Sequence, residues 1–203
     1  MFLIGLTGGI AAGKTTVAER LVQLGAVQID ADVLARQAVE KGSQGLLKVV
    51  DAFGKDVLNP EGDLNRQALA DIVFKEPSKR VTLESIDHPI VRNLASQAVL
   101  AQPEDAIVVY TVPLLVEAGV DLPFDFIITV EAPLNTQVER MVKSRGMSSQ
   151  QALDRIASQA TAAQRANRAD VILNSNQSFG QMIDDVDALW HVIQRRATQK
   201  RDV

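Results

Sequence analysis

The sequence predicts an α/β protein built on a five-stranded parallel sheet that is flanked by helices, and three observations lead to this expectation. First, five short apolar runs are separated by longer stretches with apolar residues at helical spacing, as in strands joined by crossover helices. Second, the runs are mainly apolar rather than alternating between apolar and polar residues, which is typical of buried parallel strands. Third, a glycine-rich segment lies where the first strand would turn into the first helix. The expected strands are residues 1–6, 26–29, 106–112, 126–130 and 170–173.

The glycine-rich segment is the strongest functional signal in the chain. Residues 8–15 read GGIAAGKT and satisfy every fixed position of the phosphate-binding pattern G-x-x-x-x-G-K-[ST]. Its glycines turn backbone N–H groups toward a polyphosphate, and the dipole of the helix over residues 15–24 favours negative charge there. A glycine-rich turn that merely carries a lysine is disfavoured by the strand before it and the helix after it.

The loop predicts binding of ATP together with Mg²⁺. Lys14 is expected to reach the β- and γ-phosphates, and the hydroxyl of Thr15 to bind the metal. The expected nucleotide-binding residues are Gly9, Ile10, Ala11, Ala12, Gly13, Lys14, Thr15 and Thr16.

Length and composition favour one α/β core with insertions. The chain has 203 residues, 46% of them hydrophobic, and a formal net charge of −4, which argues against nucleic acid as a partner. The absence of cysteine excludes disulfides and thiolate metal sites, so any metal should be bound by oxygen. No segment approaches the roughly 20 apolar residues that span a bilayer, and no signal peptide is evident. We therefore expect a soluble cytoplasmic protein without membrane partners, and a monomer by default.

Two acidic residues come directly after the second strand. Asp30 and Asp32 are delivered to the carboxyl edge of the sheet, where open parallel sheets bind ligands. Acids that face an anionic nucleotide are expected to serve Mg²⁺ or proton transfer. Alternatively, Asp32 caps the helix predicted over residues 33–39. Arg36, one turn into that helix, either holds a substrate phosphate or is simply solvated.

The 75 residues between Asp30 and Ala106 predict an inserted helical region, because one crossover helix needs far fewer. Gly42 and Gly45 are expected to break the helical pattern first, and His88-Pro89 to interrupt its last segment. His88 itself is more typical of a packing or hydrogen-bonding residue than of a catalyst. The expected helices cover residues 46–53, 64–74 and 77–101, with a turn at 59–63.

The residues directly after the third strand include no aspartate. Many phosphate-loop ATPases and GTPases place a metal-binding aspartate at this point, whereas this chain continues as Pro113-Leu114-Leu115. Another acidic residue must therefore take the place of this aspartate, and this favours Asp30 and Asp32 as candidates. Glu117 is a secondary candidate, with a solvated helix residue as the alternative.

Two helices after the fourth strand predict a lid. A first helix opens at Pro133, and Ser148 with Gln151 forms a capping box that begins a second. Cations at their junction could reach a triphosphate, or could only complement the end of a helix. The candidate lid cations are Arg140, Lys143, Arg145, Arg165 and Arg168.

The end of the chain completes the expected core. Asn174 comes after the fifth strand, where an adenine could lie, although polar turn chemistry explains it nearly as well. Residues 179–199 predict a closing amphipathic helix whose apolar stripe packs on the core.

Taken together, these motifs resemble the dephospho-CoA kinase family over nearly the whole chain. Asp-Ala-Asp after the second strand, with Pro-Leu-Leu-x-Glu after the third, is more specific than the loop. The resemblance is carried by Leu6 to Ile10, Gly13-Lys14-Thr15, Asp30-Ala31-Asp32, Ala35-Arg36, His88-Pro89, Pro113-Leu114-Leu115-x-Glu117, Ile156-Ala157-Ser158-Gln159 and Arg168-Ala169-Asp170.

The resemblance implies a P-loop kinase fold of the nucleoside-monophosphate-kinase type. The implied reaction transfers the γ-phosphate of ATP to the ribose 3′-hydroxyl of dephospho-CoA. Asp32 matches the family's proposed base and Arg140 its lid arginine, which with Lys14 form the implied catalytic set. Acceptor contacts are implied for Asp32, Arg36, His88, Leu115 and Glu117, metal contacts for Thr15 and Asp30, and a nucleotide contact for Asn174. The implied domains are a core of residues 1–32, 102–135 and 163–203, an acceptor-binding insertion of residues 33–101 and a lid of residues 136–162.

The chain departs from the family pattern at a few positions. Ala11-Ala12 stand where glycine and serine are usual, Ser144-Arg145 where arginine and aspartate are common, and Asn174-Ser175 where Asp-Asn is usual. Other interpretations remain: a kinase for another small hydroxyl acceptor, a nucleotide-dependent switch ATPase, or a non-catalytic ATP-binding regulator. The switch lacks support because no N-K-x-D guanine motif occurs.

Overall fold

The computed structural model describes residues 1–117, 119–120 and 122–202. Contacts between residues divide the chain into two compact units, of which one comprises Met1–Asp30 with Ala101–Val203 and the other Ala31–Leu100. The first unit holds the sheet, and the second is helical.

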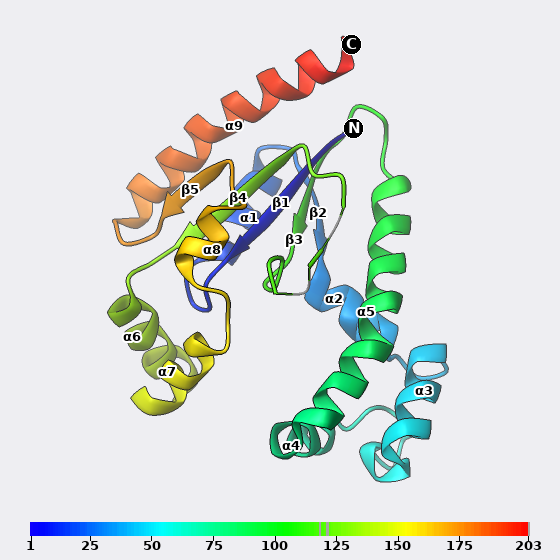
Figure 1. Ribbon diagram of the computed structural model, residues 1–203. Helices are drawn as coiled ribbons and strands as arrows, with labels where there is room; N and C mark the ends of the chain where they lie inside the picture. The colour runs from blue at the N-terminus through cyan, green and yellow to red at the C-terminus, as the bar shows by residue number, and fades with distance from the viewer. Residues whose placement is uncertain (118, 121, 203) are drawn as a thin grey trace. The chain divides into compact units, whose positions relative to one another are not determined.

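The sheet confirms the predicted fold class. Five parallel strands lie in the order β2-β3-β1-β4-β5, so that β1 is central between β3 and β4 (Figure 1). In register, Leu6 of β1 lies opposite Thr111 on one side and Ile128 on the other. The strands are β1 (Phe2–Gly8), β2 (Val27–Asp30), β3 (Ile107–Thr111), β4 (Phe126–Glu131) and β5 (Val171–Asn174).

One face of β1 is covered by the first and last helices of the sheet unit. Phe2, Ile4 and Leu6 point to this face, since alternate residues of a strand share a side, and pack in one cluster with side chains of α1 and α9. Both helices are amphipathic, as their sequences predict. Arg20 of α1 also forms an ion pair with Asp187 of α9 at 2.6 Å. The helices of this unit are α1 (Lys14–Gln23), α6 (Leu134–Arg145), α7 (Ser149–Ala157), α8 (Ala162–Ala166) and α9 (Phe179–Arg201).

Side-chain caps define where α7 begins. Ser148 accepts a hydrogen bond from the backbone of Gln151, whose side chain accepts one from the backbone of Ser148. This capping box confirms the start predicted for the second lid helix. Helices α6 and α7 pack against each other near the carboxyl ends of the strands (Figure 1).

The helical unit has its own hydrophobic core. Val39, Val49, Val57 and Leu69 are buried together, with Phe53 and Leu64 among the side chains packed against them. A short 3₁₀ turn, η1 (Lys55–Val57), lies within this unit. Its helices are α2 (Ala31–Ala38), α3 (Gln44–Phe53), α4 (Arg66–Lys75) and α5 (Pro77–Leu100). Over the described residues, no helix of the chain is both long and apolar enough to span a membrane.

Two expectations for this unit are wrong. Helix α5 continues through His88-Pro89 rather than breaking there, because α2, α3 and α4 all pack against it and these contacts offset the local cost of the proline. Gly45 lies inside α3 rather than breaking it, and a Cβ there would stand 2.0 Å from the carbonyl oxygen of Ala38. The glycine is needed for this close approach and not for a turn.

Candidate active site

The phosphate-binding loop lies at the carboxyl end of the central strand. Strand β1 ends at Gly8 and α1 begins at Lys14, so the loop leaves the sheet between β3 and β4, where open α/β sheets bind ligands. Gly8 has a φ of 148°, and a Cβ there would lie 2.2 Å from the carbonyl oxygen of Val130. Glycine is therefore required for the loop to leave the sheet so close to β4.

The first turn of α1 is open to an anion. Its N-cap, Gly13, has left-handed φ and ψ of 96° and 20°, and it offers no side-chain hydrogen bond to the helix. The first turn also carries no acidic side chain. The N–H groups of a helix's first turn have no partner within the helix, and together with the helix dipole they favour a phosphate at this place.

Lys14 arches back over the loop. Its Nζ donates hydrogen bonds to the carbonyl oxygens of Gly8 at 2.7 Å and Gly9 at 3.2 Å. Thr15 is the next residue in the first turn of α1, and its side chain is exposed. The cation expected at the polyphosphate thus lies against the loop, and the residue expected to bind the metal follows it directly in the first turn.

Arg140 binds the loop from the lid side. From α6 its Nη1 donates to the carbonyl oxygen of Ala11 at 3.1 Å and to Oγ of Ser175 at 2.9 Å, and its Nη2 donates to the carbonyl oxygen of Ser175 at 2.7 Å. The guanidinium is therefore fixed beside the loop, as a group that stabilises transferring phosphate must be. Lys143, Arg145 and Arg168 are exposed instead.

Arg165, another candidate lid cation, is committed to an ion pair. Its side chain is buried, and its Nε and Nη2 each lie 2.6 Å from a carboxylate oxygen of Glu131, at the end of β4. Nη1 also donates to the carbonyl oxygen of Ala160. Through these bonds Arg165 attaches the α7–α8 connection to the end of β4. The Arg165 side chain also lies close to the phosphate-binding loop, since a Cβ at Gly9 would stand 3.1 Å from its Nη2.

Two side chains attach the segment after α7 to the core. Oε1 of Gln159 accepts a hydrogen bond from the backbone N–H of Ile10 at 2.8 Å, and Oε1 of Glu117 accepts one from the N–H of Ala160 at 2.7 Å. Gln159 belongs to the Ile156–Gln159 motif, but sequence reasoning gave it no role. Only its place in that motif could have drawn attention to it.

Asp30 ends β2 at the same edge of the sheet. It lies opposite Thr111 of β3 and is half-buried. Burial, and then the negative charge of Asp30, raise the pKa of Tyr110 above its ordinary value. The Asp30 carboxylate therefore acts on the end of β3, where the sequence places no acid of its own.

Asp32 lies in the helical unit, one residue inside α2. The helix begins at Ala31 rather than after Asp32, so this carboxylate lies in the first turn and not at the position before the helix. Asp32 and Arg36 are both side chains of α2, and both are exposed. A negative charge in the first turn interacts favourably with the positive end of the helix dipole. Asp32 therefore stabilises α2 whatever its functional role.

A family model, described as dephospho-CoA kinase, matches residues 2–181. The chain belongs to the dephospho-CoA kinase family. Its relatives include dephospho-CoA kinases of Streptomyces avermitilis, 42% identical over 98% of this chain and 97% of the relative, and of Thermobifida fusca, 42% identical over 97% and 98%. The dephospho-CoA kinase of Leifsonia xyli is 43% identical over 94% and 98%. The resemblance stated from the motifs is thereby confirmed.

Solved structures support the kinase fold. A Thermus thermophilus protein, TT1252, superimposes with a TM-score of 0.81 at 31% identity, covering 94% of this chain and 96% of that one. Dephospho-CoA kinase from Campylobacter jejuni has a TM-score of 0.67 at 23% identity over 95% and 97%. Shikimate kinase from Bacteroides thetaiotaomicron has a TM-score of 0.54 at 16% identity over 95% and 98%. The P-loop kinase fold that we predicted is therefore confirmed.

The remaining residues implied by the dephospho-CoA kinase pattern have varied surroundings. His88 is exposed on α5, whereas Leu115 is fully buried and packs near Gly5. Oδ1 of Asn174 accepts a hydrogen bond from the N–H of Asn176 at 2.9 Å, which forms the local turn considered for it. Glu117 holds Ala160 through its N–H. The ligand contacts of these residues stay predictions.

The donors available to a metal suit magnesium bound through a nucleotide. The described residues contain no group of three or more His, Asp or Glu side chains arranged for a metal ion. Mg²⁺ usually keeps several waters and binds one or two protein oxygens together with substrate phosphates, so such a group is not required. The Thr15 hydroxyl and the Asp30 carboxylate are hard oxygen donors of the kind that Mg²⁺ prefers.

Proposed function

We propose that this member of the dephospho-CoA kinase family transfers the γ-phosphate of ATP to the ribose 3′-hydroxyl of dephospho-CoA, giving CoA and ADP. The observation that carries the proposal is the phosphate-binding loop after β1 with the Arg140 guanidinium fixed against it, at 3.1 Å from the carbonyl oxygen of Ala11. This arrangement supplies an anion cradle and a positioned cation, which phosphoryl transfer requires more than any covalent chemistry.

The loop binds the nucleotide in this proposal. Backbone N–H groups between Gly9 and Thr16 bind the β- and γ-phosphates, apart from those of Ile10 and Ala12, which donate to Gln159 and Gly9. Lys14 exchanges its contacts with loop carbonyls for phosphate oxygens. Arg140 lies beside the phosphate as charge moves toward the bridging oxygen. Asn174 is the proposed contact near the adenine.

Asp32 is the proposed base. The acceptor 3′-oxygen forms a bond to the γ-phosphorus while the bond from that phosphorus to the bridging oxygen of ADP breaks. The hydroxyl proton passes to the Asp32 carboxylate. A carboxylate that orients and accepts this proton typically accounts for about 10²- to 10⁴-fold of rate.

Magnesium, when bound, would neutralise charge on the β- and γ-phosphates. Thr15 and Asp30 would hold it, through the hydroxyl and through the carboxylate at the end of β2. The proposed acceptor contacts also include Arg36, His88, Leu115 and Glu117. Because the side chain of Leu115 is fully buried, it would support the acceptor site by packing.

We also propose separate roles for two parts of the chain. We propose that residues 33–101 bind the acceptor and that residues 136–162 act as a lid over the triphosphate, which keeps water from accepting the γ-phosphate. The separate core of the helical unit supports the first assignment. A monomeric state and a cytoplasmic location also stay predictions.

A panel of acceptors tests the function. ADP release is measured with dephospho-CoA, with shikimate and with nucleoside monophosphates as acceptors, and Lys14→Ala serves as the control for contaminating activity. We expect kcat/KM with dephospho-CoA to exceed that with every other acceptor by at least about 10²-fold, since a site built to bind one acceptor rejects analogues that leave its polar groups unpaired. Equal or higher kcat/KM with another acceptor would assign the site to a different small hydroxyl compound, and acceptor-independent ADP release would assign it to an ATPase.

A further inference from the structure

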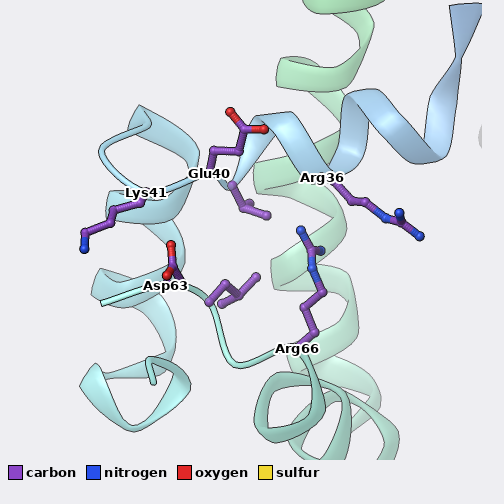
Figure 2. A pocket seen from close by; sticks show the side chains of 7 residues that line it. Arg36, Glu40, Lys41, Asp63 and Arg66 are labelled. Carbon is purple, nitrogen blue, oxygen red and sulfur yellow. The ribbon is translucent and has the colours of Figure 1, made fainter. Parts of the chain in front are cut away.

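The helical unit contains a basic pocket of its own, built from residues of Ala31–Leu100 alone. Its volume is about 220 Å³. Its apolar floor is formed by Val39 and Leu64, which belong to the core of this unit and are therefore held in place. The lining residues are Arg36, Val39, Glu40, Lys41, Asp63, Leu64 and Arg66 (Figure 2).

Two arginines from different helices define one side of the pocket. Arg66 projects from the start of α4 toward α2, and Arg36 extends from the last turn of α2 (Figure 2). In the part of the chain that the structure describes, neither guanidinium takes part in a salt bridge or hydrogen bond. Lys41 points away from both arginines, and its Nζ donates to the carbonyl oxygen of Glu61.

Arg66 lies at the N-terminus of α4, where the helix dipole disfavours a cation, and Asp87 of α5 offers it a partly compensating negative charge. Arg66 is the first residue of α4, after the N-cap Asn65, whose side chain accepts a hydrogen bond from the N–H of Ala68 at 3.0 Å. The N–H of Asn65 donates to the carbonyl oxygen of Val57 at 2.8 Å, which fixes the backbone on the other side. A cation at the N-terminus of a helix opposes the dipole, so an anion bound there would be favoured by both the helix and the arginine.

The size and charge of the pocket limit its ligand. It lies below the range of about 300–1,000 Å³ that is usual for pockets enclosing a whole small molecule, so it would take one part of a longer ligand. Its side chains carry three positive and two negative charges, with Asp63 beside Lys41 and on the side away from the arginines (Figure 2). An anionic group of about phosphate or diphosphate size suits the arginine side.

We propose that Arg36 and Arg66 bind the 5′-diphosphate of the acceptor, dephospho-CoA. This inference rests on the proposed function, because that function supplies the acceptor. The diphosphate is the anionic part of dephospho-CoA, and it joins the adenosine, whose 3′-hydroxyl reacts, to the pantetheine arm. Each guanidinium can donate two parallel hydrogen bonds to phosphate oxygens. Arg66, outside every motif of the family resemblance, thus becomes a specificity-determining residue for the acceptor.

The test is the steady-state kinetics of Arg66→Ala. We expect the KM for dephospho-CoA to rise about 10- to 100-fold, which is the range for losing one hydrogen-bonded charge. kcat at saturating acceptor and the KM for ATP should change less than about twofold, because uniform binding of the acceptor affects KM alone. Arg66→Lys should recover only part of the loss, because an ammonium lacks the paired donors. Arg80→Ala is the matched control, because Arg80 is an exposed arginine of α5 that pairs with Glu84 and does not line the pocket, and its KM for dephospho-CoA should stay at the wild-type value.

Inorganic pyrophosphate separates this pocket from the nucleotide loop. In the wild type it should inhibit in competition with dephospho-CoA, and Arg66→Ala should weaken that component while inhibition in competition with ATP persists. An unchanged KM for dephospho-CoA in a folded Arg66→Ala enzyme overturns the subsite but leaves the proposed function intact. An equal rise in the KM for ATP would also overturn it, since the pocket would then serve ATP. A wild type that does not phosphorylate dephospho-CoA would instead defeat the proposed function.

Discussion

The side chain of Gln159 accepts a hydrogen bond from the backbone N–H of Ile10, in the middle of the phosphate-binding loop, at a distance of 2.8 Å. The next residue, Ala160, is bound through its N–H by Glu117 and through its carbonyl oxygen by Arg165. The connection after α7 is thus attached to the loop and to the sheet at two consecutive residues. We infer that Gln159 helps to hold the loop in its phosphate-binding shape.

Replacing Gln159 with alanine should therefore weaken ATP binding. A hydrogen bond of this kind is worth about 1 kcal/mol, so the KM for ATP should rise about 3- to 10-fold while the KM for the acceptor stays nearly constant. Gln150→Ala is the matched control, because Gln150 is an exposed glutamine of α7 whose side chain bonds within its own helix, to Asp154. Equal changes in KM for the two variants would show that Gln159 has no effect on the loop.

Ala11→Gly should stabilise the protein. Ala11 is, among the described residues, the one non-glycine with a positive φ, at 55°, a conformation that costs an L-residue about 1–2 kcal/mol. Glycine removes that strain but loses about 0.4–1 kcal/mol to greater freedom of the unfolded chain, which leaves a gain of roughly 0.5–1 kcal/mol. Ala12→Gly should instead destabilise, since Ala12 is buried and is not among the residues with positive φ. Urea unfolding measures both, and a destabilised Ala11→Gly protein would contradict the strain.

Arg140→Lys should lower turnover more than it lowers nucleotide binding. Lysine keeps the charge but cannot donate at once to Ala11 and to both oxygens of Ser175, so the cation is no longer fixed beside the phosphate. We expect kcat to fall about 10²-fold, as for loss of a positioned donor, with a KM for ATP within about threefold of the wild type. Lys143→Ala, on the exposed side of α6, should leave both parameters unchanged. Near-normal kcat in Arg140→Lys would remove Arg140 from the proposed catalytic set.

Asp32→Asn separates catalysis from helix stability. Because Asp32 lies inside the first turn of α2, losing its charge should lower the free energy of unfolding by only about 0.3–1 kcal/mol. Turnover should fall about 10²-fold or more, with little change in the KM for ATP. Partial recovery at high Mg²⁺ would indicate that the carboxylate acts through the metal instead. A folded variant with normal turnover would move the proposed base to Asp30 or Glu117.

Asp87→Asn should stabilise the protein at neutral pH. Burial raises the pKa of Asp87 above its ordinary value of 3.8, against the opposing charges of His88 and Arg66, and its buried Oδ1 has no hydrogen-bond partner in the described structure. The folded state therefore holds this proton more tightly than the unfolded state does. Stability is lost as the pH rises from 3.8 through the folded pKa, and it stays lower above that value.

Thermal unfolding of Asp87→Asn across mildly acidic and neutral pH tests this expectation. The variant should unfold roughly 2–4 °C above the wild type at pH 7, corresponding to about 1 kcal/mol, and the difference should shrink on acidification. Asp71→Asn, at an exposed position on α4, serves as the control and should show no such pH-dependent gain. A gain that is independent of pH would show that the charge of Asp87 is not its cause.

Much of the fold was predictable because its signals are local. The five strands, the loop from Gly8 to Thr15 and the start of α7 at Ser148 each depend on residues within a few positions of one another. Prediction failed where distant packing decides the outcome. Pro89 stays inside α5 because three helices hold it, and Gly45 serves a close approach to Ala38 that no local pattern reveals.

The candidate site divides in the same way. Phosphate binding by Gly13, Lys14 and Thr15 could be predicted from the sequence alone, because the residues concerned lie in one strand, loop and helix. The ion pair of Arg165 with Glu131, 34 residues away, and the hydrogen bond of Gln159 to Ile10, 149 residues away, became visible only in the folded protein. Pairings of this kind depend on strand order and on helix packing. Neither can be predicted from the spacing of residues along the chain.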